Sequence, residues 1–188
     1  MDEIELLSGI VSKTGDVIAG VGPDQLDRPT PCTDMDVSGL VDHLVGWIRS
    51  FAAAANGRTY EGDPTAVDIA DPAGDFRASA ESLVAGWREH GFDRTVSISG
   101  GEGMPAEMVF NITVMEYLAH GWDLAVATGQ PVPYTDDEAE EVLRRARGTL
   151  APAFRGEGKS FGEIVPVPDD APAIDRLVGF MGRRPQRT

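Results

Sequence analysis

The segment over residues 108–128 constrains the fold most, because it is long enough for several helical turns and is apolar on nearly every side. A helix without a continuous polar face has to be surrounded by other parts of the protein. Gly129 follows it, and Pro131 and Pro133 prevent the helix from continuing. We therefore expect a buried helix over residues 106–128, with other helices packed around it.

Helical periodicity, capping residues and Gly or Pro stops predict the remaining elements. Further helices are expected at residues 2–19, 36–56, 72–90, 135–150 and 172–181, with a short strand at 95–99 and a short extended piece at 164–165. Pro-rich and Gly-rich stretches at residues 23–35 and 57–71 predict long connections. The sequence thus predicts an all-α bundle with long crossovers, extra short helices and at most a minor β element.

The length of 188 residues favours one domain with a substantial core. We expect the bundle to occupy about residues 2–150 and a C-terminal extension to occupy about residues 151–188.

Two polar side chains interrupt the apolar central helix with metal-ligand spacing. Glu116 and His120 are four residues apart, so they lie on one helix face. A buried carboxylate needs a proton or a cation, and the apolar neighbours of Glu116 supply neither. A divalent metal would meet that need.

His43 is the candidate third ligand, because it lies on the apolar stripe of Leu40, Leu44, Trp47 and Phe51. Two imidazoles and one carboxylate form a three-ligand set that leaves coordination positions open, as catalytic zinc sites do. Other interpretations stay open from spacing alone. A histidine on an apolar face is more often a core residue bonded to a backbone carbonyl, and a Glu four residues before a His can form a local ion pair.

Three further side chains are candidates for a role near this set. Asp123, three residues after His120, could orient that imidazole, or it could cap backbone or pair with an arginine. Cys32 precedes a helix, whose positive end could activate a thiol, but a structural role is favoured. Trp122 could line a metal cavity only if its face of the helix turns that way.

The formal charge of −15, from 31 acidic and 16 basic residues, disfavours binding to nucleic acids and anionic membranes. A small group of basic residues at the end of the chain is interpreted as a solvated tail, namely Arg176, Arg183, Arg184 and Arg187. The single cysteine excludes a disulfide framework and fits a cytoplasmic protein. Neither a secretory signal nor a membrane span is expected.

Several segments resemble the DinB/YfiT-like superfamily, in the branch related to the N-terminal domain of mycothiol-dependent maleylpyruvate isomerase. They are Thr30-Pro31-Cys32 before the His43 helix, residues 116–130 with Glu116 and His120, and residues 174–183. The resemblance implies an up-down-down-up four-helix bundle that holds a divalent metal through His43, Glu116 and His120. Many relatives have a histidine where this chain has Glu116, and the carboxylate is typical of the isomerase-related branch.

The resemblance also implies chemistry with a low-molecular-weight, mycothiol-like thiol and a small-molecule substrate, and a homodimer as a candidate assembly. The metal expected is zinc, with nickel, iron or manganese as alternatives. The isomerase that names the branch has an additional C-terminal domain, for which this chain has little room after about residue 150. We therefore expect a thiol-dependent transferase or isomerase-like enzyme. The alternatives are a non-catalytic metal- or ligand-binding module and a metal-free dimer scaffold.

Overall fold

The computed structural model describes residues 2–156 and 161–185, and its regular secondary structure is almost entirely α-helical. The helices are α1 (Glu3–Ala19), α2 (Val37–Ala55), α3 (Pro72–His90), α4 (Ala106–Thr128), α5 (Asp136–Thr149) and α6 (Ala173–Phe180). Two 3₁₀ turns, Pro23–Gln25 and Pro152–Phe154, lie in connections. The predicted all-α class is therefore confirmed.

Local signals explain where most helices begin. The side chain of Asp2 caps α1, Asp36 caps α2 and Asp71 caps α3, each by accepting hydrogen bonds from backbone N–H groups of the first turn. Thr135 and Glu138 form a reciprocal capping box at the start of α5. Because these signals are short-range, the predicted helix boundaries differ from the observed ones by at most about two residues.

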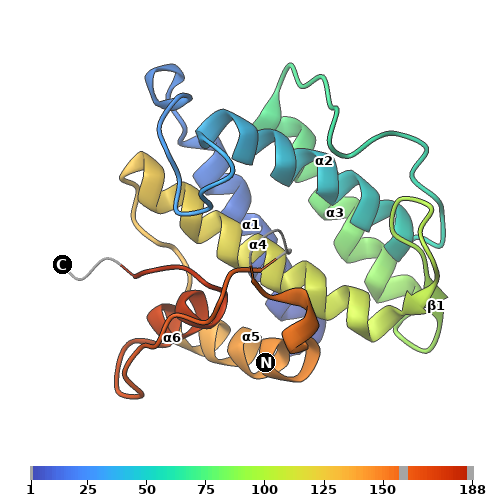
Figure 1. The fold of residues 1–188 in the computed structure, drawn as a ribbon. Helices are drawn as coiled ribbons and strands as arrows, with labels where there is room; N and C mark the ends of the chain where they lie inside the picture. The colour runs from blue at the N-terminus through green and yellow to red at the C-terminus, as the bar shows by residue number, and fades with distance from the viewer. Residues whose placement is uncertain (1, 157–160, 186–188) are drawn as a thin grey trace.

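The four long helices form an up-down-down-up bundle. In this bundle α1 packs against α3 and α4, and α2 packs against the same two helices. Asp16 of α1 pairs with Arg77 near the start of α3, and Asn56, just after α2, bonds to Ser82 of α3. Figure 1 shows α4 between the α2–α3 pair and the α5–α6 pair, which matches the predicted burial of α4.

The β element is smaller than the predicted strand. Only Thr95–Val96 forms β1, which pairs antiparallel with β2, Met104–Pro105. The strand stops there because the chain turns at Ser97, whose hydroxyl donates to the Gly101 carbonyl. The predicted extended piece at residues 164–165 forms no strand, although the Val165 amide donates to the Gly179 carbonyl.

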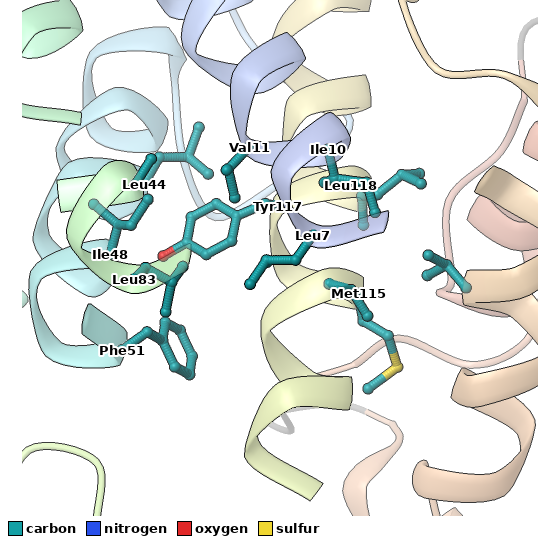
Figure 2. Packing of buried hydrophobic residues seen from close by; sticks show 14 of the residues in the cluster. Leu7, Ile10, Val11, Leu44, Ile48, Phe51, Leu83, Met115, Tyr117 and Leu118 are labelled. Carbon is teal, nitrogen blue, oxygen red and sulfur yellow. The ribbon is translucent and has the colours of Figure 1, made fainter. Parts of the chain in front are cut away.

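The core is one continuous apolar cluster in which Tyr117 of α4 has a central place. Figure 2 shows its ring among side chains of other helices, with Val11 of α1, Leu44 and Ile48 of α2, and Leu83 of α3 around it. This packing fixes the rotation of α4 about its axis. Glu116 and His120 are therefore directed away from this part of the core, toward α2 and the C-terminal segment.

Among residues 2–156 and 161–185, no helix has both the length and the apolar character required to cross a bilayer.

Candidate metal centre

The structure brings the three predicted ligands together. The Nε2 atom of His43 lies 2.5 Å from Glu116 Oε1, and the Nε2 atom of His120 lies 3.5 Å from the same oxygen. One donor atom from each residue lies within 4.8 Å of the others. The imidazoles meet edge to face, with ring centroids 5.0 Å apart. Side chains from α2 and α4 thus converge on one point, as the stripe on α2 and the four-residue spacing on α4 predicted.

The electrostatics of Glu116 favour a negative charge at this point. Burial by itself raises the pKa of this carboxyl, but the neighbouring His120 and His43 outweigh it and lower the pKa to about 2. The carboxylate is therefore ionised at neutral pH, and it faces two imidazole nitrogens. Two nitrogens and one carboxylate oxygen form a donor set that suits a divalent metal such as zinc.

Asp123 holds His120 in a defined orientation. The Nδ1 atom of His120 donates to Asp123 Oδ2 over 3.0 Å, while its Nε2 faces Glu116. Placing the ring proton on Nδ1 leaves the lone pair of Nε2 free for a metal, which is the usual role of a carboxylate behind a metal-bound histidine. Two of the interactions expected for Asp123 are present in the structure: the contact with His120 and an ion pair with an arginine.

That arginine is Arg183, and its position corrects the expectation of a solvated basic tail. Its guanidinium is buried, donates to both carboxylate oxygens of Asp123, and donates through Nη1 to the Met181 carbonyl. Burial raises the pKa of Asp123, but the hydrogen bonds from His120 and Arg183 outweigh it and keep that pKa below its ordinary value. A buried carboxylate needs such a partner, which explains why this residue leaves the solvent.

The other basic residues near the end of the chain differ in their surroundings. Arg176 donates to Glu140 and to the Ala171 carbonyl, so it also belongs to the folded surface, whereas Arg184 is exposed. Arg187 lies outside the described residues. The segment of family resemblance, residues 174–183, contains Arg176 and Arg183 but not Arg184 or Arg187.

A cavity of about 800 Å³ opens from the three ligands and is bounded by α2, α4, the β1–β2 turn and the C-terminal segment. Cys32 lines it, and burial raises the pKa of this thiol, which Arg183 only partly offsets. A raised pKa favours the structural role over that of an activated nucleophile. Trp122 is buried in the core and is not among the lining residues, whereas Trp47 is.

A second set of donor atoms, from Cys32, His120 and Asp123, also lies within 4.8 Å. Both oxygens of Asp123 already accept hydrogen bonds from Arg183. The set around Glu116 is therefore the better candidate, because its carboxylate faces two imidazole nitrogens instead of a guanidinium.

Comparison with known proteins identifies the family of this chain. The family model described as the mycothiol maleylpyruvate isomerase N-terminal domain matches residues 8–125, a span that contains His43, Glu116 and His120. Two uncharacterised proteins from two strains of Mycobacterium tuberculosis are each 33% identical over 174 residues, which cover 89% of this chain and 90% of each relative.

A solved structure has a similar fold. The crystal structure of a histidine-to-alanine mutant of the mycothiol-dependent maleylpyruvate isomerase matches with a TM-score of 0.59 and 17% identity, covering 85% of this chain and 72% of that chain. These findings are consistent with the DinB-like resemblance noted in the sequence. Because the family model matches more than half of the sequence, this chain belongs to the mycothiol maleylpyruvate isomerase N-terminal domain family.

Proposed function

We propose that this protein is a metal- and thiol-dependent enzyme of the transferase or isomerase-like type, which joins a mycothiol-like thiol to a small electrophile. The observation that carries the proposal is the convergence of His43, Glu116 and His120 at one end of a large cavity. A cavity of this size can hold two small reactants, whereas a purely structural metal site needs no such space.

Each residue of the site would have a distinct role. His43 and His120 would hold zinc through Nε2 and Glu116 through its carboxylate, while Asp123 keeps the proton of His120 on Nδ1. Bound zinc supplies a positive charge that favours the thiolate over the thiol at neutral pH. Arg183 balances the charge of Asp123, so the carboxylate can stay ionised behind the imidazole.

The reaction is balanced without a further reactant. In the transferase case, a bond forms between the thiol sulfur and the electrophilic carbon, that carbon releases its leaving group as an anion, and the thiol proton passes to water. In the isomerase-like case, the sulfur adds to an activated cis alkene, the single bond rotates, and elimination returns the thiol with the trans alkene. The walls of the cavity hold the two reactants together in both cases.

The test combines metal content with turnover. Protein purified without chelator should carry close to one zinc per chain, and His43→Ala, Glu116→Ala and His120→Ala should each lose most of it. His90→Ala is the matched control, because His90 is exposed at the end of α3. With mycothiol, wild-type protein should release bromide from a neutral alkyl bromide or convert dimethyl maleate to dimethyl fumarate, and the three variants should not.

Two results would decide against the proposal. Full zinc content with neither reaction accelerated would leave a non-catalytic binding protein. Wild-type protein without zinc, and with no gain in thermal stability when zinc is added, would favour the metal-free scaffold.

A further inference from the structure

The cavity continues well beyond the three metal-ligand candidates. On α4, the lining residues Met108, Ile112, Glu116 and His120 follow one another at intervals of four, so they form a single row along the helix. Eight residues separate Met108 from Glu116, which corresponds to about 12 Å along the helix axis. The polar end of this row is the candidate metal centre, and the other end is entirely apolar.

The facing wall on α2 has the same organisation. His43, Trp47 and Phe51 line the cavity in one row, with centroid distances of 6.2 Å from His43 to Trp47 and 6.2 Å from Trp47 to Phe51. The helices run antiparallel. His43 near the start of α2 meets His120 in the second half of α4, whereas Ser50 near the end of α2 bonds to Ser99, which precedes α4. Both rows therefore begin at the ligands and become apolar in the same direction.

Apolar side chains from other segments also line the cavity. They are Ile98 and Met104 from the β1–β2 region and Leu150, Phe154, Phe161 and Met181 from the C-terminal part of the chain. Trp47, Met108 and Ile112 are only half-buried, although they occupy the inner faces of their helices. Apolar surface that is left uncovered inside a cavity is a typical feature of a ligand site.

The charges of the described lining residues disfavour an anionic body in the cavity. Asp34 and Glu116 are carboxylates, and among the described lining residues Arg183 alone is cationic. Its guanidinium is already paired with Asp123. A dicarboxylate would find no unpaired cation in the described lining, and the formal charge of −15 adds repulsion.

We infer that the electrophilic co-substrate has a neutral, extended apolar body, an alkyl or aryl chain, which lies between the α2 and α4 rows with its reactive carbon at the ligands. This inference rests on the proposed function for the reaction itself, but the binding of the apolar body does not require turnover. The inferred substrate is thus a neutral apolar molecule and not a small dianion.

The test measures binding in the absence of thiol. Calorimetric titrations of the whole protein with neutral 1-alkanols, from butanol to octanol, should give an affinity that rises about fourfold per added methylene. Maleate, the dicarboxylate probe, should not bind detectably. Zinc content is measured on the same samples.

Two variants with a matched control locate the site. Met108→Gln, on α4, and Ile98→Gln, between β1 and β2, should each weaken octanol binding at least tenfold while zinc content stays at the wild-type value. Ile164→Gln is the control, since Ile164 is apolar, is 49% exposed and does not line the cavity. This variant should leave octanol binding unchanged.

The outcomes separate the two proposals. The inference would be overturned if the affinity for alkanols does not depend on chain length, or if neither substitution weakens binding. This holds even if zinc-dependent turnover is found. Binding of maleate or of mycothiol that Met108→Gln abolishes, without alkanol binding, would assign the groove to that molecule instead. Chain-length-dependent binding in a protein without zinc would support binding of an apolar body between the two rows and reject the proposed reaction.

Discussion

His120 Nδ1 lies 3.0 Å from Asp123 Oδ2, and this carboxylate is completely buried. The contact fixes which nitrogen of His120 faces Glu116. We expect Asp123→Asn to weaken zinc binding by about 10–100-fold, because an amide orients the ring less strongly and does not increase its basicity. The variant should also lose about 3–5 kcal/mol of stability, since Arg183 is left without a counter-charge.

Competition with a chromogenic chelator measures the zinc affinity, and urea denaturation measures the stability. Asp34→Asn is the matched control, because Asp34 lines the same cavity but is exposed. Equal zinc affinity in Asp123→Asn and wild type would mean that His120 is not a ligand or needs no orientation.

The second prediction concerns the partner of Asp123. Arg183→Met should destabilise the protein by about 3–5 kcal/mol at pH 7, because a buried carboxylate then lacks its cation. Arg184→Met, at the exposed neighbouring position, should change stability by less than about 0.5 kcal/mol. Urea denaturation in the presence of chelator checks both.

The pH dependence of this effect has a definite sign. The pKa of Asp123 is lower in the folded protein than its ordinary value, as the hydrogen bonds from His120 and Arg183 outweigh burial. A depressed pKa stabilises the fold above the unfolded pKa of about 3.9, and this contribution is lost as the pH falls through the folded pKa. The difference in free energy of unfolding between wild type and Arg183→Met should therefore decrease as the pH is lowered from 5. If this difference increases on acidification, the stabilisation does not come from the ionised Asp123 carboxylate.

The sequence predicted those parts of the site that depend on local geometry. The four-residue spacing of Glu116 and His120 and the apolar stripe around His43 are properties of single helices, and they placed three side chains correctly on inward faces. Arg183 was misassigned because its contact with Asp123 spans 60 positions and forms only when the C-terminal segment folds back over α4. Basic residues near a chain end carry no local sign of burial.

The sequence predicted a strand in the region of β1, but local patterns predicted neither β2 nor the cavity. A two-residue strand such as β2 exists because β1 lies beside it, not because of any propensity of Met104–Pro105. Apolar stripes predict which faces turn inward, but not that Trp47 and Ile112 remain half-buried. Whether a cavity remains between α2 and α4 depends on how these helices pack with the β1–β2 turn and the C-terminal segment.

A third prediction concerns the close approach of α4 to Tyr134. A Cβ atom added at Gly121 would lie 1.7 Å from the Tyr134 hydroxyl oxygen and 3.1 Å from Thr14 Oγ1. Gly121→Ala should therefore cost about 1–3 kcal/mol or more, and should disturb the adjacent His120. Gly148→Ala is the control, because nothing lies near that position in α5, and it should stabilise the protein by about 0.5–1 kcal/mol.

Thermal denaturation of both variants provides the measurement. Combining Gly121→Ala with Tyr134→Phe removes the nearest atom and should recover part of the loss. If the double variant is as unstable as the sum of the single ones, the cost arises elsewhere in the helix.

The fourth prediction compares two buried tyrosines. The Tyr117 hydroxyl has no hydrogen-bond partner among the described residues and lies in the apolar cluster shown in Figure 2. The Tyr134 hydroxyl, in contrast, bonds to Thr14 Oγ1 at 2.8 Å and donates to the Tyr117 carbonyl at 3.2 Å. The same chemical change, Tyr to Phe, should therefore have opposite effects at the two positions.

Tyr117→Phe should raise the free energy of unfolding by about 1 kcal/mol, because it removes an unsatisfied buried hydroxyl without changing the ring contacts. Tyr134→Phe should lower it by a similar amount, since Thr14 and the Tyr117 carbonyl each lose a partner. Urea denaturation at pH 7 with chelator measures both without interference from metal binding. A loss of stability in Tyr117→Phe would mean that a buried water satisfies this hydroxyl, and that the core between α2, α3 and α4 contains a polar pocket.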